Sequence, residues 1–251
     1  LFDRIETKSK SLLVIGNLSN TLIKDNGFNG IGVKLFGDFA TVQINSEYML
    51  VGAAVLDNYF SKFCYQNGIT GYEFLYTIPG SIGGNIYMNA GCYDQEIKDK
   101  LISVIFFDIN EKKVYEKNIK ELKFDYRKGF QKNNTIILYG KFKITHSEQN
   151  SIKKLMLEYE NIRNKTQPQK VNCCGSIFKN PSNQSAWKLI KSSIDESFYN
   201  GPVKLSKIHS NFFENEPNIS ANSIDLFISK IQKKVMDKHK IVLEKELRII
   251  D

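Results

Sequence analysis

The amino-acid sequence predicts an α+β protein. Three patterns lead to this prediction: short strands separated by glycine turns fill roughly the first 45 residues, three amphipathic helices follow at wide intervals, and a pair of adjacent strands lies between the first two helices. A chain of 251 residues can bury a sizeable core, and this length is typical of one large domain or of two to three small ones.

The strand predictions rest on apolar runs and on period-two alternation between turn residues. The first apolar run leads into a small-polar turn at residues 16–20, and the dipeptides Asn26-Gly27 and Asn29-Gly30 mark further turns. We expect strands at residues 12–15, 31–35, 41–44, 102–109, 113–115, 135–144 and 241–250.

The three helices are predicted from apolar residues at i, i+3 and i+4 spacing. The first spans residues 53–67, the second has its apolar stripe at residues 152–162, and the third has its stripe at residues 224–235. Because Pro168 stops the second helix, we expect a linker near residues 165–168.

The composition favours a globular protein with anionic partners. Hydrophobic residues make up 41% of the chain, and no apolar run approaches the length of about 20 residues that spans a bilayer, so we expect no membrane insertion. The 35 Lys and Arg residues exceed the 27 Asp and Glu residues, which gives a formal net charge of +8. The lysines are dispersed without an arginine-rich block, so we do not expect nucleic-acid binding.

The four cysteines are too few and too irregularly spaced for a disulfide framework or a zinc site, so we expect a reducing, cytoplasmic setting and no metal. The pair Cys173-Cys174 invites a redox interpretation, but two small buried residues are the commoner explanation. The first residue is Leu1, not Met, so we expect a fragment of a longer chain. No apolar segment typical of a signal peptide precedes the first predicted strand.

Residues 71–96 form the least ordinary stretch, because five glycines stand there among large apolar residues. Glycine lets backbone N–H groups approach a ligand closely and permits positive φ, so Pro-Gly-Ser-Ile-Gly-Gly at residues 79–84 suits a loop that wraps a phosphate or a flat ring. A tight turn between buried strands is the simpler explanation for a single glycine pair. Five glycines in one run favour the ligand-binding loop.

Further motifs carry polar groups that suit an anion. Residues 16–20, Gly-Asn-Leu-Ser-Asn, are a possible phosphate turn that matches neither common phosphate-binding fingerprint. Lys179 and Asn180 follow a Gly-Ser turn and are placed to meet an anion. Arg127 stands beside two aromatic residues, where a surface arginine that packs its stem is an alternative explanation. His209 is expected to be a hydrogen-bonding structural residue.

The order of the motifs is more specific than any one of them. The motifs are IGNLSN, EFLYTIPGSIGGNIYMNAGCY, FDYRKG, QPQKVNCCGSIFKNP, KLSKIHSNFFEN and LEKELRII. From about Ser11 onward, this order resembles the MurB family of UDP-N-acetylenolpyruvoylglucosamine reductases, FAD enzymes of peptidoglycan (cell wall) precursor synthesis. The short interval between Arg127 and Ser176 resembles the shorter form of the family, which lacks an extra loop.

The resemblance implies a two-part FAD-binding fold with a C-terminal α+β substrate-binding domain. Residues 1–45 would form a small β-rich N-terminal FAD-binding unit. Residues 46–165, joined by the C-terminal strand at residues 241–251, would form a mixed α/β FAD-binding domain, and residues 166–240 would bind the substrate. The residues implied to hold FAD are Gly16, Asn17, Ser19, Asn20, Ile78, Pro79, Gly80, Ser81, Gly83, Gly84, Asn89, Arg163 and Arg248.

The resemblance also implies the reaction of a monomeric enzyme. NADPH as co-substrate would reduce FAD, and reduced flavin would deliver hydride to the enolpyruvyl double bond of a UDP-sugar whose diphosphate lies near Lys179 and Asn180. Ser176 matches the family's proton donor, while Arg127 and Glu246 match the pair that stabilises the enolate-like intermediate. An arginine fork can neutralise carboxylate charge, and a protonated glutamate can share it by hydrogen bonding.

Among the departures from the family pattern, three replace glycines near the cofactor. Leu18, Thr77 and Asp94 stand where the family usually has glycine, and each is expected to add bulk near the cofactor. Two other interpretations stay open: a FAD-linked oxidase or dehydrogenase of the same fold with another substrate, and a non-catalytic nucleotide-binding protein that would show no flavin absorbance.

Overall fold

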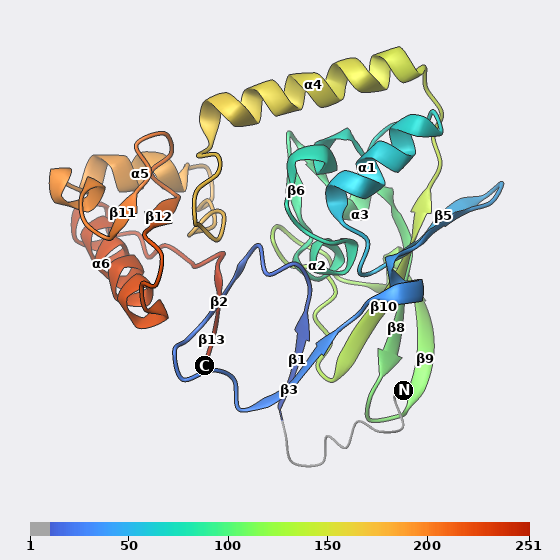
Figure 1. The fold of residues 1–251 in the computed structure, drawn as a ribbon, viewed down its shortest axis with the longest axis horizontal. Coiled ribbons are helices and arrows are strands. Elements are labelled where there is room, and N and C mark those ends of the chain that lie inside the picture. The colour runs from blue at the N-terminus through green and yellow to red at the C-terminus, as the bar shows by residue number, and fades with distance from the viewer. Residues whose placement is uncertain (1–10) are drawn as a thin grey trace. The chain divides into compact units, whose positions relative to one another are not determined.

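The computed structural model describes residues 11–251, and residues 1–10 of the predicted N-terminal unit lie outside the described part (Figure 1). The chain forms two compact units, whose ranges are Leu1–Asn17 with Gly30–Asn161 and Leu18–Asn29 with Ile162–Asp251. The chain therefore passes between the units three times. This division differs from the expected three domains, because the expected N-terminal unit is shared between both parts.

The first unit is built on an antiparallel five-stranded sheet with the order β4-β5-β10-β8-β9. Its strands are β4 (Val42–Ile44), β5 (Tyr48–Gly52), β8 (Leu101–Asp108), β9 (Lys113–Asn118) and β10 (Thr135–Lys143). The strands predicted at residues 41–44, 102–109, 113–115 and 135–144 are confirmed, whereas β5 was not predicted. One difference is that β4, which we expected within a separate N-terminal unit, pairs with β5 in this sheet.

Three helices cover one face of the sheet and lie together in Figure 1: α1 (Asp57–Gln66), α2 (Ile82–Met88) and α3 (Ile97–Lys100). Their apolar side chains meet those of the sheet in one core, in which Phe60, Ile86 and Phe142 are completely buried. The first predicted helix is thus confirmed, although it begins at Asp57, after the residues that connect it to β5.

The opposite face of the sheet is covered by β1 (Ser11–Ile15) and β3 (Gly30–Lys34), which pair in parallel. Leu12, Val14 and Val33 pack there against the buried side chains of Phe107 and Ile136. Because both faces of the sheet are covered, its central strands carry apolar side chains on both faces. This packing also explains why the N-terminal strands do not form a unit of their own.

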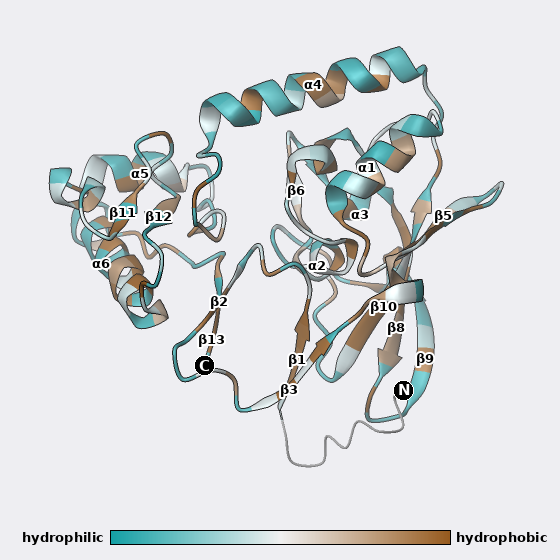
Figure 2. Cartoon of the chain, viewed as in Figure 1, coloured by the Kyte–Doolittle hydropathy of each residue, from teal (hydrophilic) through white to brown (hydrophobic). Residues whose placement is uncertain are grey.

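Helix α4 (Gln149–Thr166) confirms the second predicted helix and is mostly hydrophilic in Figure 2. It buries Ile152 and Met156, and its Tyr159 ring stacks on Tyr93 with a centroid distance of 4.1 Å. Tyr93 belongs to the turn of a small hairpin, β6 (Gly91–Cys92) and β7 (Gln95–Glu96), that follows α2. The stacked rings therefore fix this hairpin to α4.

The second unit has a separate apolar core between helices and short strands. Its elements are α5 (Ala186–Ser193), α6 (Ala221–His239), the antiparallel pair β11 (Val203–Leu205) and β12 (Phe213–Asn215), and the parallel pair β2 (Thr21–Ile23) and β13 (Arg248–Ile250). The third predicted helix is confirmed by α6, whose residues Ile228, Ile231 and Val235 are completely buried. No helix in the described part of the chain combines the length and apolarity needed to cross a membrane.

The C-terminal strand differs from its prediction in length and in partner. Only β13 is regular strand, and it pairs with β2, whereas we expected residues 241–251 to join the domain of residues 46–165. The physical reason is apolar burial, since Leu22 of β2 and Ile249 of β13 both pack against the second core.

One buried carboxyl stands out in the first core. Asp57, the first residue of α1, is completely buried, and its Oδ1 accepts a hydrogen bond of 2.7 Å from Asn85 Nδ2. Its Oδ2 is buried without a partner among the described residues. Burial raises the pKa of Asp57 to about 8, because desolvation disfavours the charged form.

We predict that this carboxyl makes the protein less stable as the pH rises. Between its ordinary pKa of 3.8 and about 8, the folded state keeps a proton that the unfolded state has lost, so the free energy of unfolding falls through this window and levels off above it. The limiting slope is ~1.4 kcal/mol per pH unit. Urea denaturation from pH 5 to 9 measures it, and Asp57→Asn removes this contribution. Equal slopes for both proteins would contradict the assignment.

Candidate active site

Two glycine-containing segments meet in the first unit. The side-chain amide of Asn17 donates a hydrogen bond of 2.5 Å to the Pro79 carbonyl. A Cβ added to Gly16 would lie only 2.9 Å from Ser81 Oγ. The turn after β1 and the segment before α2 therefore lie next to each other.

Most glycines of the 71–96 run serve packing inside the protein. An added Cβ would come within 2.5 Å of the Asp57 carboxylate at Gly80, within 2.8 Å of Ala53 Cβ at Gly83, and within 2.2 Å of the Gln95 carbonyl at Gly91. The fourth glycine, Gly71, has a φ of 95°, a backbone conformation that residues with a side chain rarely adopt. Packing therefore explains these four glycines without a ligand, and their contact with a cofactor stays a prediction.

The fifth glycine is different. An added Cβ at Gly84 would meet only Ser81 Oγ, at 3.5 Å, and Gly84 is exposed. Ser81 Oγ itself is buried and has no hydrogen-bond partner among the described residues. Gly16 and Gly84 are exposed, and each lies next to this buried hydroxyl group, which can still donate and accept a hydrogen bond. We call these three residues the glycine–serine surface.

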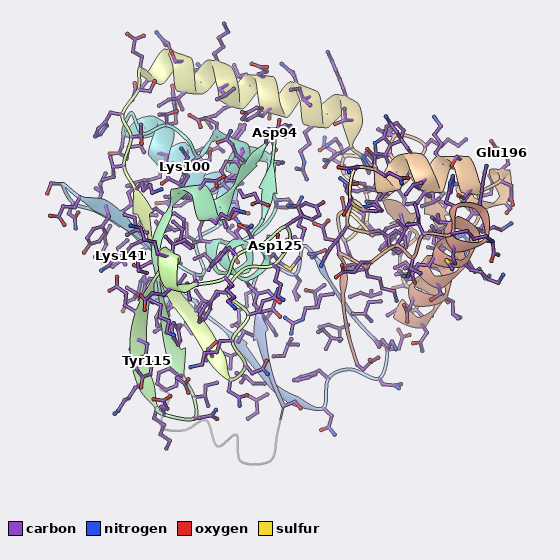
Figure 3. The ribbon with its side chains drawn as sticks, turned by 180° about the vertical axis from the view of Figure 1, so that it is seen from behind. Asp94, Lys100, Tyr115, Asp125, Lys141 and Glu196 are labelled. Carbon is purple, nitrogen blue, oxygen red and sulfur yellow. The ribbon has the colours of Figure 1, made fainter. Side chains whose placement is uncertain are left out.

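The three departures from the family pattern do not have the same consequence. Leu18 and Asp94 adopt left-handed φ angles of 55° and 57°, where glycine is normally favoured. Asp94 shares its turn with Tyr93, which also has positive φ, and it lies next to α4 (Figure 3). Thr77 ends a 3-10 helix without positive φ, so its backbone does not require glycine.

Arg127 stands in a tight turn of the first unit. The backbone N–H of Lys128 donates to the Asp125 carbonyl at 3.0 Å, and the N–H of Asp125 donates to the Lys128 carbonyl at 2.8 Å. Arg127 has a φ of 55° in this turn, and its Nη2 donates to the Gly91 carbonyl at 3.0 Å. Its guanidinium also lies over the Tyr126 ring, 4.8 Å from the centroid. The turn therefore presents a partly buried cation on a backbone that is constrained from several sides.

Ser176 and Glu246 are brought together in the second unit by backbone pairing. The carbonyl of Ile177, the neighbour of Ser176, accepts hydrogen bonds from the N–H groups of Glu246 at 2.8 Å and Leu247 at 3.3 Å. The N–H of Lys179 donates to the Glu244 carbonyl at 2.9 Å. Two motifs far apart in sequence thus run side by side, with Ser176 and Glu246 at neighbouring positions.

The turn predicted to bind phosphate is divided between the units. Gly16 and Asn17 belong to the first unit, whereas Ser19 and Asn20 belong to the second. Asn20 Nδ2 donates to the Glu246 carbonyl at 3.0 Å, and its carbonyl accepts from the Arg248 N–H at 3.2 Å. Asn20 therefore holds the backbone on both sides of Leu247.

Other predicted residues have contacts within the protein that the sequence did not reveal. Lys179 Nζ forms an ion pair of 2.5 Å with Glu244, and Asn180 Oδ1 accepts from the N–H of Ala186 at the start of α5. Arg163 lies in the last turns of α4, and Ile78 follows the 3-10 helix that ends at Thr77. Neither these contacts nor these positions decide whether the four residues also bind a ligand, so their predicted roles in ligand binding stay predictions.

The sequence analysis missed Asn211. This residue is 4% exposed, and its side chain accepts from the Phe178 N–H at 3.0 Å and donates to the Phe178 carbonyl at 2.8 Å. Its own carbonyl accepts from the Ile177 N–H at 2.9 Å. Asn211 therefore holds the segment that follows Ser176. An asparagine directly before two phenylalanines was the available signal, because a polar residue beside core residues needs buried partners.

The neighbouring His209 has the structural role that we expected. Its Nδ1 accepts from the Asn211 N–H at 3.2 Å, and burial lowers its pKa, so the neutral form is favoured. Among residues 11–251, no group of three or more His, Cys, Asp or Glu side chains is arranged to hold a metal ion. All four cysteines are free thiols.

Comparison with known proteins gives consistent results over nearly the whole chain. Residues 4–111 match the family model "FAD binding domain", and residues 167–250 match "UDP-N-acetylenolpyruvoylglucosamine reductase, C-terminal domain". The reductase of that name from Pelagibacter ubique is 38% identical over 247 residues, which are 97% of this chain and 82% of the relative. The reductase from Wolbachia sp. subsp. Brugia malayi is 36% identical over 248 residues, covering 98% and 84%.

A solved structure agrees with the sequence relatives. The crystal structure of UDP-N-acetylenolpyruvylglucosamine reductase (MurB) from Thermus caldophilus matches with a TM-score of 0.84 and 28% identity, covering 97% of this chain and 86% of that chain. The predicted fold class is therefore confirmed, and this chain belongs to the MurB family of UDP-N-acetylenolpyruvoylglucosamine reductases.

Proposed function

We propose that this chain reduces UDP-N-acetylglucosamine enolpyruvate to UDP-N-acetylmuramate with NADPH and bound FAD, in peptidoglycan precursor synthesis. The relatives described above carry the name of this activity. The observation that best supports it is the pairing of the Ser176 and Glu246 segments through the Ile177 carbonyl. It supplies, in one unit, a hydroxyl and a carboxyl of the kinds that the reaction needs.

The residues of the first unit fit FAD. The glycine–serine surface leaves room beside the backbone at Gly84, where an added Cβ would meet only Ser81 Oγ at 3.5 Å, whereas a Cβ at Gly16 would approach the same oxygen to 2.9 Å. The Ser81 hydroxyl is a buried group that still lacks a partner among the described residues, and a cofactor oxygen or nitrogen would satisfy it. Gly16, Pro79, Ser81 and Gly84 are the residues that we propose to hold the cofactor in this unit. When bound, FAD would supply a carrier for the hydride, and so for the two electrons, of NADPH.

The protein groups have distinct tasks in the reduction of the double bond. Hydride addition to the terminal enolpyruvyl carbon moves negative charge toward the substrate carboxylate. The Arg127 guanidinium stabilises that charge with its planar donors, and a protonated Glu246 shares it by hydrogen bonding. Ser176 Oγ then gives its proton to the carbon next to the carboxylate.

Further residues of the second unit are proposed to bind ligands. Arg163 and Arg248 are cations that would stabilise a reduced, anionic flavin, and Ser19 and Asn20 complete the phosphate turn. Lys179 and Asn180 would meet the substrate diphosphate, in which case the Lys179–Glu244 ion pair must open or be shared. We also propose that the enzyme acts as a monomer in the cytoplasm.

Flavin absorbance separates this proposal from the alternatives. We predict that the purified protein, or protein reconstituted with FAD, shows the spectrum of oxidised flavin and is bleached by NADPH and recoloured by the enolpyruvyl sugar nucleotide. Protein that remains colourless with FAD supports the non-catalytic nucleotide-binding alternative. Bleaching by NADPH without recolouring supports an oxidase or dehydrogenase with another substrate.

Substitution of Gly84 by alanine tests the cofactor surface. The added methyl group would meet only Ser81 Oγ, so Gly84→Ala leaves the stability of the apoprotein within ~1 kcal/mol, while FAD binds about tenfold more weakly, as for a crowded site. Gly83→Ala is the matched control, because its Cβ would approach Ala53 Cβ to 2.8 Å and should destabilise the apoprotein itself. Unchanged FAD affinity in Gly84→Ala would argue against the surface.

Substitution of Ser176 tests the proton donor. We predict that Ser176→Ala leaves flavin reduction by NADPH unchanged but slows reoxidation by the enolpyruvyl substrate by ~10²–10⁴-fold, the usual contribution of a general acid. Stopped-flow absorbance measures the half-reactions separately. Ser193→Ala is the control, because its hydroxyl donates only to the Leu189 carbonyl within the α5 region. An equal loss in both half-reactions would exclude Ser176 as the donor.

A further inference from the structure

Asn89 holds two separate backbone segments with its side chain. It is completely buried at the C-terminus of α2 and adopts a left-handed φ of 49°. Its Nδ2 donates to the Asp125 carbonyl at 2.9 Å, and its Oδ1 accepts from the Lys98 N–H at 3.3 Å. Both ends of the carboxamide are therefore bonded within the protein.

The Asp125 carbonyl belongs to the turn that presents Arg127. It also accepts the Lys128 N–H at 3.0 Å, so the bond from Asn89 reaches the turn itself (Asp125 is labelled in Figure 3). Arg127 has positive φ, which costs about 1–3 kcal/mol for a residue other than glycine and persists only where the surroundings enforce it. Asn89 is one of the groups that enforce it.

The backbone of α2 holds the other side of the turn. The N–H groups of Gly129 and Phe130 donate to the carbonyls of Tyr87 at 3.1 Å and Ile86 at 2.9 Å. An added Cβ at Gly129 would lie 1.9 Å from the Ile86 carbonyl oxygen, so the chain lies directly against the helix. These bonds fix the residues after the turn, whereas Asn89 fixes its first residue.

The Arg127 guanidinium is held by a residue close to Asn89 in the sequence. Arg127 Nη2 donates to the carbonyl of Gly91, which lies two positions after Asn89. A change at Asn89 therefore affects both the backbone that carries Arg127 and the carbonyl that orients its guanidinium.

We propose that Asn89 is a positioning residue for Arg127 and does not bind the cofactor directly. This proposal rests on the proposed function, because it gives Arg127 its role in the step that consumes the enolpyruvyl substrate. It replaces the role that the family resemblance implied for Asn89, and it makes the two half-reactions of the enzyme respond differently to a change at this residue.

The test uses Asn89→Gly in the FAD-loaded enzyme. Glycine keeps the left-handed backbone at this helix end and removes only the carboxamide. We expect reoxidation of the flavin by UDP-N-acetylglucosamine enolpyruvate to slow by about 10- to 100-fold, the scale of a displaced catalytic group. Flavin reduction by NADPH, FAD affinity and the flavin spectrum should stay within about twofold of the unsubstituted enzyme.

Tyr72→Phe is the matched control. It also removes one hydrogen bond from a buried side chain to a backbone carbonyl, here 2.6 Å to Lys143, in the same unit, and neither residue belongs to the Arg127 turn. If Tyr72→Phe slows reoxidation as much as Asn89→Gly does, the effect is general destabilisation and the proposal is wrong. Weaker FAD binding or slower flavin reduction in Asn89→Gly alone also overturns it, because the residue would then act on the cofactor.

A double-mutant cycle tests whether Asn89 acts through Arg127. In an Arg127→Ala background, Asn89→Gly should change reoxidation by less than about twofold, whereas independent effects would multiply. Asn89→Ser, which retains a short polar side chain, provides a second variant if Asn89→Gly does not fold. Failure of the proposed function gives a different result from failure of the Asn89 proposal. In that case the substrate would not reoxidise the flavin of the unsubstituted enzyme.

Discussion

Helix α2 sets the geometry of the first unit, because its two ends hold different functional segments with backbone hydrogen bonds. At its start, the N–H groups of Ile82 and Gly83 donate to the carbonyls of Val55 and Ala53 at 2.9 Å. The glycine–serine surface lies at this end of the helix. At its end, two carbonyls and Asn89 hold the Arg127 turn. A helix of seven residues thus couples the proposed cofactor surface to the proposed catalytic cation.

In the second unit, backbone hydrogen bonds and a buried asparagine likewise hold a segment that carries a proposed catalytic residue. The carbonyl of Ile177 accepts from the Glu246 segment, and Asn211 bonds the segment on the side of Phe178. Each unit therefore uses a buried asparagine to hold the chain next to a residue proposed for the chemistry. A carboxamide suits this task because it donates and accepts at fixed positions without introducing a charge into the core.

Local strain and unpaired polar groups accompany these segments. Arg127, Leu18 and Asp94 all have positive φ, and Asp57 carries a completely buried carboxyl beneath Gly80. Such features cost free energy and usually persist where a binding or catalytic surface requires a particular backbone path. Asp94 is an exception, since its positive φ is explained by the turn of the hairpin between β6 and β7.

The sequence by itself determined the α+β class, the strands β1, β3, β4, β8, β9 and β10, all three predicted helices and, through the order of its motifs, the family. These properties follow from local periodicity and from residue types at fixed spacing. Only the tertiary structure decided that β4 joins the large sheet, that β13 pairs with β2, and that Gly80, Gly83 and Gly91 are needed for packing. It also identified the partners of Asn89 and Asn211. Strand partners, close backbone approaches and buried hydrogen bonds join residues far apart in the chain, and local sequence patterns carry no information about which distant residues will meet.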